Sequence, residues 1–235
     1  MTETLRVLIA EDSLEDAFLI VQELSGGGFE VTSERVASAV AMHSALDLHT
    51  WDLIITDYCI PGFGGPAALE LYQQKLLDIP FIMVSGVLGE SLAVEMVKLG
   101  AHNYVMKDQL NRLVPAVRQE LRAAEERQIH KQAQATAAYI TSMVESCDHA
   151  IIGTTLDGTV VSWNTGADRL FGYTAVEIVG RSGAVLVPAY RPEDLSAILQ
   201  RIREGGPVES SETALLRKDG RPVHVLLAIS PIKEA

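Results

Sequence analysis

The chain has 235 residues, of which 48% are hydrophobic and 21% charged, which is enough for one large domain or two of ordinary size. Its formal net charge of −12 argues against binding to nucleic acid or to an anionic membrane. Two cysteines without a CxxC pair, and no apolar run near the roughly 20 residues of a membrane span, lead us to expect a cytoplasmic protein.

The first half of the chain alternates short apolar runs with amphipathic patterns. Strands are expected at residues 5–10, 29–32, 53–56, 80–85 and 103–106. Helices are expected between them, at residues 14–24, 37–48, 66–75 and 90–99. Nearly continuous apolar strands separated by helices indicate a parallel sheet covered on both faces, which is a doubly wound α/β domain.

Residues 115–146 show no strand signal and are rich in alanine, glutamate, glutamine and arginine. This composition predicts one long helix whose middle, residues 125–134, is almost wholly polar. A helix that is polar all round is either a connector or part of a loosely held coiled coil. We therefore expect a domain core over residues 1–114, a linker helix over 115–146 and a second domain over 147–235.

The second half of the chain has paired strand patterns joined by Asp-Gly turns. Such pairs are expected within residues 150–163 and 209–230. Thr174 and Glu177 have the spacing of a helix capping box, and another helix is expected within residues 192–203. Hairpins that flank helices indicate an α+β domain with an antiparallel sheet.

Several of the parallel strands are expected to end in polar residues. These are Glu11 and Asp12 after the first strand, Asp57 after the third, Ser85 in the fourth and Lys107 after the fifth. The carboxyl ends of the strands in an open parallel sheet form its ligand crevice. Three carboxylates there raise each other's pKa values unless a cation lies among them, and oxygen ligands suit Mg²⁺. The set suits phosphoryl transfer to Asp57, with Mg²⁺, Lys107 and Ser85 neutralising the transferred charge.

Over roughly residues 5–126, this pattern resembles the receiver domain of two-component response regulators. The resemblance implies a flavodoxin-like fold, Mg²⁺ as cofactor, and a histidine kinase or phosphotransfer protein as phosphodonor. It also implies one role for each matching residue: Glu11 and Asp12 as the acidic pair, Asp57 as phosphoacceptor, Cys59 as a metal ligand through its backbone carbonyl, Ser85 and Tyr104 as switch residues, and Lys107 as the phosphoryl-binding lysine. Two positions depart from the family pattern, since Glu11 stands where aspartate is commoner and Asp108 follows Lys107 where proline is usual.

Two other interpretations remain for this half of the chain. A pseudo-receiver keeps the fold without being phosphorylated and acts as a scaffold for dimerisation or ligand sensing. Its usual mark is loss of the acceptor or the lysine, and Asp57 and Lys107 are both present. Haloacid-dehalogenase-like phosphatases also use a carboxylate nucleophile, but they need an aspartate two residues later, where this chain has Cys59.

Over roughly residues 139–235, the chain resembles the PAS domain family. The matching residues are the Asp157-Gly158 turn, Trp163-Asn164, Leu170-Phe171-Gly172-Tyr173, Glu177, Gly180-Arg181 and the turn at residues 217–220. The resemblance implies a sensory domain that forms a homodimer together with its preceding helix. Trp163, Phe171 and Tyr173 are interpreted as core residues rather than as ligand contacts.

The same resemblance bears on the cofactors of the second domain. Flavin-binding members need a reactive cysteine just after the Gly-Arg pair, where this chain has Ser182. Haem-binding members use a histidine on a helix that would fall within residues 188–205, and this segment has none. We therefore expect neither haem nor flavin, and the ligand of the domain, if any, is unknown.

A PAS domain normally continues with one more strand after a segment like residues 230–235. We therefore expect the chain to be the N-terminal part of a longer protein whose output domain is a histidine kinase or else a diguanylate cyclase. The chain itself shows no kinase histidine box and no nucleotide-binding glycine motif. The function hypothesis is phosphorelay signal transduction, in which phosphorylation of Asp57 switches the receiver and signals through the linker helix to the PAS domain.

Overall fold

The computed structural model describes residues 3–86, 96–188 and 210–232. The chain divides into two compact units, Met1–Gln132 and Ala133–Ala235. The helix expected at 192–203 lies outside the described residues, as does most of the one expected at 90–99, of which residues 96–99 are described and helical. Among the helices of the described residues, none combines the length and apolar character that crossing a membrane requires.

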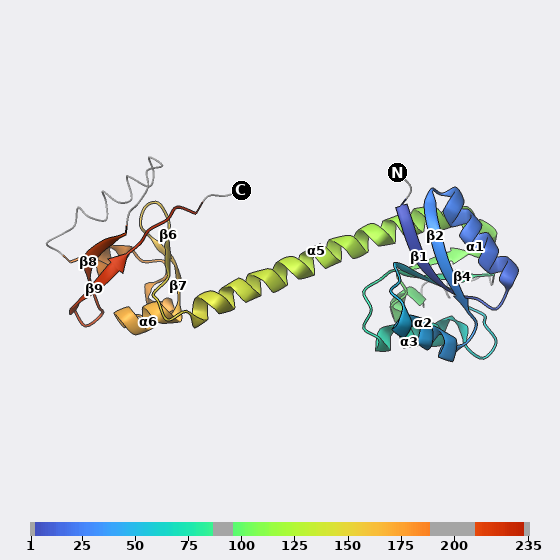
Figure 1. The fold of residues 1–235 in the computed structure, drawn as a ribbon, viewed down its shortest axis with the longest axis horizontal. Helices are drawn as coiled ribbons and strands as arrows, with labels where there is room; N and C mark the ends of the chain where they lie inside the picture. The colour runs from blue at the N-terminus through green and yellow to red at the C-terminus, as the bar shows by residue number, and fades with distance from the viewer. Residues whose placement is uncertain (1–2, 87–95, 189–209, 233–235) are drawn as a thin grey trace. The chain divides into compact units, whose positions relative to one another are not determined.

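The first unit contains a five-stranded parallel sheet with the strand order β2-β1-β3-β4-β5. Figure 1 labels β1, β2 and β4 of this sheet. Its strands are β1 (Glu3–Ala10), β2 (Phe29–Val36), β3 (Leu53–Asp57), β4 (Phe81–Ser85) and β5 (Asn103–Met106). Its helices are α1 (Leu14–Gly26), α2 (Ala39–Leu48), α3 (Gly64–Gln74), the short 3-10 helix η1 (Lys107–Arg112) and the first part of α5 (Leu113–Ser146). The doubly wound α/β fold predicted from the sequence is confirmed.

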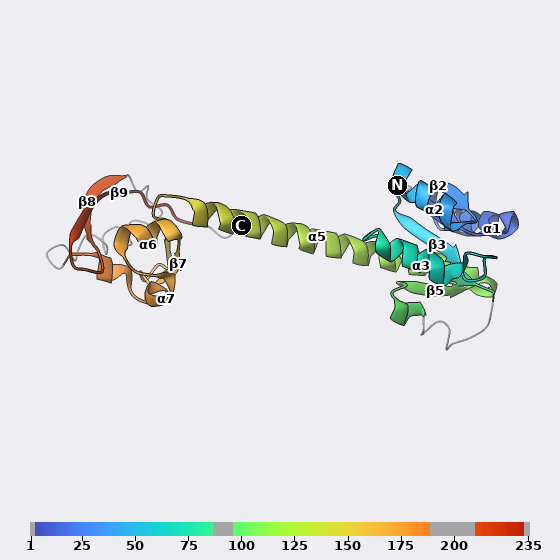
Figure 2. The ribbon, with the colours of Figure 1, turned by 90° about the horizontal axis from the view of Figure 1, so that it is seen from below.

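Helices cover both faces of this sheet, so β3 and β4 are buried along their whole length. One hydrophobic cluster joins the sheet to α1 and to the start of α5, and another joins it to α2 and α3. Figure 2 shows the ribbon of these elements from a second side. Successive side chains of a strand point to opposite faces, and β1 shows this directly. Val7 and Ile9 enter the first cluster, whereas Leu8 and Ala10 enter the second.

β2 extends to Val36, four residues beyond the end expected from the sequence. It lies at the edge of the sheet, and it pairs with β1 over eight residues. Most of the added residues are polar and at least partly exposed, as an edge strand allows. The backbone pairing, rather than an apolar pattern, therefore sets the length of this strand.

The start of α5 belongs to the core of the first unit. Leu113, Ala116 and Val117 are buried, and the buried Glu120 accepts a hydrogen bond of 3.0 Å from Asn103 Nδ2. From residue 128 to residue 143 every side chain of the helix is exposed. The long, mostly polar helix expected over residues 115–146 is thus observed as α5.

The second unit contains the end of α5, two antiparallel hairpins and short helices. Its other elements are β6 (Ile152–Thr154), β7 (Val160–Trp163), α6 (Thr165–Phe171), α7 (Ala175–Ile178), the 3-10 helix η2 (Gly183–Leu186), β8 (Ser211–Leu216) and β9 (Pro222–Leu227). Both predicted hairpins form, as β6–β7 and β8–β9, and α7 has the predicted capping box between Thr174 and Glu177. The core lies between β7, α6, α7 and η2.

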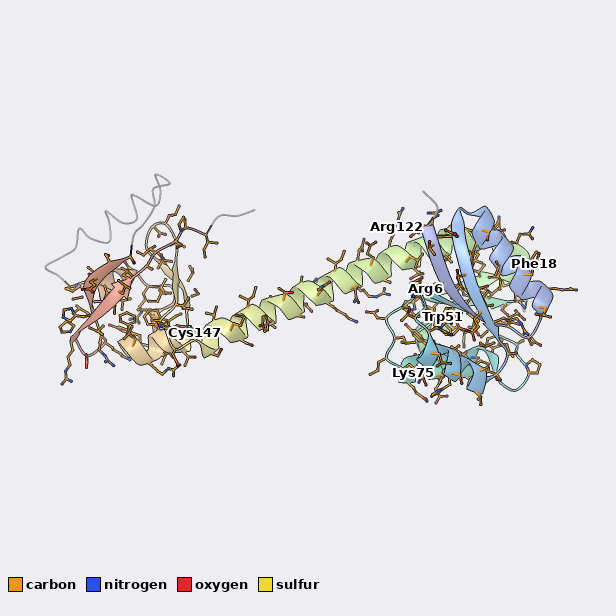
Figure 3. All side chains as sticks on the ribbon, in the orientation of Figure 1. Arg6, Phe18, Trp51, Lys75, Arg122 and Cys147 are labelled. Atoms are coloured by element: carbon orange, nitrogen blue, oxygen red, sulfur yellow. The ribbon has the colours of Figure 1, made fainter. Side chains whose placement is uncertain are left out.

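Asn164 joins the end of α5 to the rest of this unit. Its Nδ2 donates to the carbonyl oxygens of Val144 and His149, at 2.8 and 3.0 Å, and its Oδ1 accepts from the backbone N–H groups of Ile151 and Ala167. One buried amide thereby ties together the C-terminus of α5, the segment before β6 and the first turn of α6. Cys147 lies in this connection (Figure 3).

Candidate functional site

The register of the parallel strands brings four strand ends to one edge of the sheet. The aligned pairs are Ala10 with Thr56, Asp57 with Val84, and Ser85 with Met106. Glu11 follows Ala10, so it lies beside Asp57, and Lys107 follows Met106, so it lies just beyond Ser85. The sheet therefore brings together the residues that were predicted from their positions at strand ends.

Three carboxylates of this edge form a compact cluster. One oxygen from each of Glu11, Asp12 and Asp57 lies within 4.8 Å of the others. Glu11 is 1% exposed and Asp57 6% exposed, whereas Asp12 is exposed. Asp57 Oδ1 is buried and has no hydrogen-bond partner among the residues that the structure describes. Carboxylate oxygens with free acceptor capacity fit a hard cation such as Mg²⁺.

The Lys107 ammonium lies against the same carboxylates. Its Nζ is 2.8 Å from Glu11 Oε2 and 3.1 Å from Asp57 Oδ2, and it also pairs with Asp16 Oδ2. Burial disfavours the charge on Lys107, but its hydrogen bonds to Asp16, Glu11 and Asp57 more than offset this and raise its pKa above the usual value. The site therefore holds a permanent cation.

Glu11 is fixed on several sides. Burial raises the pKa of its carboxyl group, opposed by hydrogen bonds from Lys107 and from the backbone N–H of Ser13. The backbone carbonyl of Glu11 accepts a hydrogen bond of 2.7 Å from Arg35 Nη1. These contacts orient the carboxylate toward the crevice, and a bound cation would favour its ionised form.

Asp16 is a member of the site that the strand-end pattern does not predict, because it lies on α1. The side chain of Ser13 caps this helix by accepting a hydrogen bond from the Asp16 backbone N–H, at 3.2 Å. This cap places Asp16 in the first turn, next to the strand ends. A serine cap three residues before an acidic residue is a sequence signal that places Asp16 in the first turn of a helix, but it does not predict the contact with Lys107.

The predicted switch residues occupy two different environments. Ser85 is completely buried at the end of β4. Tyr104 packs in the hydrophobic cluster on the α2–α3 side, and its hydroxyl donates to Met106 Sδ at 3.3 Å. The structure thus places Ser85 at the crevice edge and Tyr104 on the sheet face behind it.

Cys59 lies in the loop between β3 and α3, two residues after Asp57, and its side chain is exposed. Its role as a ligand through the backbone carbonyl stays a prediction. A β-carbon on Gly86 would lie 3.8 Å from Lys107 Cδ, so the chain after Ser85 runs close to the lysine stem.

The aromatic residues singled out in the second unit pack together. Trp163 and Phe171 have ring centroids 5.6 Å apart, and Trp163 Nε1 donates to the carbonyl oxygen of Tyr173 at 3.1 Å. Trp163 and Phe171 are both buried in the core of this unit. This packing supports their interpretation as core residues.

Two family models match the chain, one in each half. The model of the response regulator receiver domain matches residues 7–118, and the model of the PAS fold matches residues 138–235. Both matches agree with the resemblances that the sequence motifs indicated.

Curated relatives match the first half. Chemotaxis protein CheY of Bacillus subtilis (strain 168) is 28% identical over 117 residues, which are 49% of this chain and 97% of the relative. Chemotaxis protein CheY of Treponema pallidum (strain Nichols) is 30% identical over 104 residues, which are 43% of this chain and 72% of the relative.

A solved structure with a similar fold is the N-terminal domain of a response regulator/sensory box/GGDEF 3-domain protein from Carboxydothermus hydrogenoformans. It is 25% identical, covers 52% of this chain and 98% of its own, and has a TM-score of 0.45.

The chain belongs to the response regulator receiver family, and its receiver domain is followed by a PAS domain, which together indicate a role in two-component signalling.

Proposed function

We propose that Asp57 accepts a phosphoryl group and that this reaction switches the receiver domain. The observation that carries the proposal is the state of the two Asp57 oxygens. Oδ2 is held by the Lys107 ammonium, whereas Oδ1 is buried without a hydrogen-bond partner among the described residues. A carboxylate oriented by a cation, with one oxygen uncommitted, is suited to act as a nucleophile.

In the proposed step, a carboxylate oxygen of Asp57 forms a bond to the phosphorus of the donor. The bond between phosphorus and the donor's leaving atom breaks, and its electron pair stays with the donor. With acetyl phosphate, acetate leaves and Asp57 becomes an acyl phosphate, so no proton has to leave Asp57. Mg²⁺ held by Glu11, Asp12 and Asp57 would neutralise charge on the phosphoryl oxygens, and Lys107 adds a fixed positive charge.

We further propose that the added charge is sensed at the end of β4 and transmitted through β5. Ser85 and Met106 are aligned across these two strands, and β5 continues through η1 directly into α5. A shift of the Ser85 hydroxyl toward the phosphoryl group would disturb this pairing and the packing of Tyr104 next to it. Phosphorylation would then act as a local electrostatic event that biases α5 between two positions.

The phosphodonor is proposed to be a histidine kinase or phosphotransfer protein that approaches over α1. Leu14 and Phe18, four residues apart on this helix, are 71% and 67% exposed, and Phe18 extends away from the helix (Figure 3). Such a surface beside an acidic crevice suits an apolar contact that positions the donor's phosphorylated side chain.

We also propose a homodimer in which α5 pairs with α5 of a second copy. Its exposed part shows the 4-3-4-3 spacing of a coiled-coil seam, formed by Ile129, Ala133, Thr136, Ile140 and Met143. Ile140→Glu should therefore raise the dimer dissociation constant about tenfold or more, since it buries a charge in the seam. Sedimentation equilibrium measures this, and Ala138→Glu, on the opposite face, is the matched control. Equal changes in the dimer dissociation constant for the two variants would contradict a dimer interface at this seam.

The alternative function is a constitutive scaffold in which the receiver fold is not phosphorylated. Intact-mass measurement after incubation with acetyl phosphate, with and without Mg²⁺, separates the two. We expect a phosphoryl adduct on the wild-type chain that needs Mg²⁺ and is absent from Asp57→Asn.

Beryllofluoride, which mimics the phosphoryl group on aspartate, gives a second measurement. Failure to form an adduct together with failure to bind beryllofluoride would contradict the proposal and favour the scaffold. Beryllofluoride binding that Asp57→Asn abolishes would support the acceptor site even where hydrolysis outruns detection of the adduct.

A further inference from the structure

The Lys107 ammonium is shared among three carboxylates that come from different elements. Glu11 follows β1, Asp57 ends β3, and Asp16 lies in the first turn of α1. An ammonium group has three N–H donors, so each carboxylate can take one of them. Two of the three partners, Glu11 and Asp57, are among the three residues proposed above to hold Mg²⁺.

Lys107 and a metal ion therefore compete for the same two carboxylates. Each hydrogen bond that Lys107 makes to Glu11 or Asp57 opposes metal binding, both by occupying an oxygen and by placing a positive charge beside the cation. Asp16 differs from the other two because it does not belong to the carboxylate cluster suited to a metal. Its contact with Lys107 can persist when the other two carboxylates turn to a cation.

Asp16 is also well placed to hold the lysine on its own. Its backbone is fixed by the Ser13 cap at the start of α1. Its side chain is 36% exposed, against 8% for Asp57, so its charge is better hydrated. A hydrated carboxylate at the rim can stay ionised and keep its hydrogen bond to the Lys107 ammonium when Glu11 and Asp57 bind a cation.

We infer that Asp16 is a positioning residue that holds the Lys107 ammonium on the α1 side of the crevice and thereby keeps Glu11 and Asp57 available to Mg²⁺. The inference rests on the metal site in the proposed function and deepens it. Without Asp16, Lys107 would settle between Glu11 and Asp57, and the site would also lose one negative charge. Both changes weaken Mg²⁺ binding.

The test is isothermal titration of the full chain with MgCl₂ alone, with no phosphodonor present. We expect Asp16→Asn to raise the dissociation constant for Mg²⁺ about fivefold, the size of one partly screened charge interaction. Glu15→Gln is the matched control, because Glu15 is the other carboxylate in the first turn of α1, is exposed, and forms no ion pair with Lys107. It should change the constant less than twofold by the same screening argument. Asp16→Glu should restore the wild-type value.

A double-mutant cycle shows whether Asp16 acts through Lys107. In a Lys107→Met background, Asp16→Asn should have a clearly smaller effect than in the wild type, because the competing ammonium is gone. Equal effects of Asp16→Asn and Glu15→Gln would overturn the inference, and so would an undiminished effect in the Lys107→Met background or a wild-type chain that does not bind Mg²⁺. Phosphoryl acceptance by Asp57 is judged separately, by adduct formation, so the two proposals can fail independently.

Discussion

Asp57 and Asn164 are both buried polar residues at the ends of strands, β3 and β7, but they have opposite surroundings. The neutral Asn164 amide uses its oxygen and its nitrogen for hydrogen bonds to five backbone groups, the longest of them at 3.5 Å to the carbonyl oxygen of Cys147. The charged Asp57 carboxylate has one oxygen on Lys107 and the other without a hydrogen bond among the described residues. A saturated neutral group fixes a backbone, whereas an unsaturated charged group is available for chemistry.

The packing around Asn164 supports its structural role. A β-carbon on Gly166 would lie 2.3 Å from the carbonyl oxygen of His149, so only glycine lets α6 approach this segment so closely. Glu145, near the end of α5, accepts hydrogen bonds from both the backbone N–H and the hydroxyl of Thr165. The end of α5 is therefore locked to α6 by several independent contacts.

Exchanging amide and carboxylate at these two sites should change stability in opposite directions, and this is the largest effect we expect. Asn164→Asp would turn a donor into an acceptor that faces the carbonyls of Val144 and His149, at a cost of about 3 kcal/mol or more. Asp57→Asn would leave two carboxylates paired with Lys107 instead of three, in a crevice that also holds Asp12, and should raise the stability of the first unit by about 1 kcal/mol.

The two tryptophans allow each unit to be followed separately. Trp51 lies in the first unit, where its Nε1 donates to the carbonyl of Ala45, and Trp163 lies in the core of the second. Urea unfolding followed by Trp163 fluorescence in a Trp51→Phe background measures how Asn164→Asp changes the free energy of unfolding of the second unit. Unfolding followed by Trp51 fluorescence in a Trp163→Phe background measures the corresponding change for Asp57→Asn in the first unit. A loss of stability in both variants would remove the distinction between the two sites.

His102 is an intermediate case, because its ring nitrogens have partners but it can still titrate. Nδ1 accepts from the Phe81 backbone N–H at 3.2 Å, and Nε2 lies 3.5 Å from Arg127 Nη2 on α5. Burial lowers the pKa of His102 and Arg127 lowers it further, against smaller opposing effects of Glu120 and Asp78. The imidazolium donates at both nitrogens and would face a donor on each side.

The stability of the first unit should therefore fall in mildly acidic solution. The unfolded chain protonates His102 near pH 6.5, whereas the folded chain does so only at lower pH, so the unfolded state binds more protons below pH 6.5. We expect the free energy of unfolding to fall by at most about 1 kcal/mol between about pH 6.5 and about pH 5.5, the limit that proton linkage sets when folded His102 stays neutral. Urea unfolding at Trp51 between pH 5 and pH 8 measures it. His102→Asn keeps an acceptor for the Phe81 N–H, and a pH dependence as steep as that of the wild type would rule out His102 as its source.

Much of the receiver half follows from local sequence. Nearly continuous apolar strands and intervening helical patterns predict the parallel sheet, and a parallel sheet necessarily gathers its strand ends at one edge. Glu11, Asp57 and Lys107 could therefore be brought together from their positions alone. The Asp-Gly hairpins and the capping box of the second unit are equally local signals, and the structure confirms them.

What the sequence by itself does not determine are contacts between residues far apart in the chain. Asp16 and Lys107 are 91 positions apart in the sequence and come into contact because α1 packs against the sheet beside β1. No local sequence pattern predicts this contact. The length of β2 depends on its pairing with β1 rather than on its own hydrophobicity. The role of Asn164 depends on α6 closing over the end of α5. Local sequence determined the elements and their polar ends, whereas tertiary packing decided which charges are shared and which polar groups are saturated.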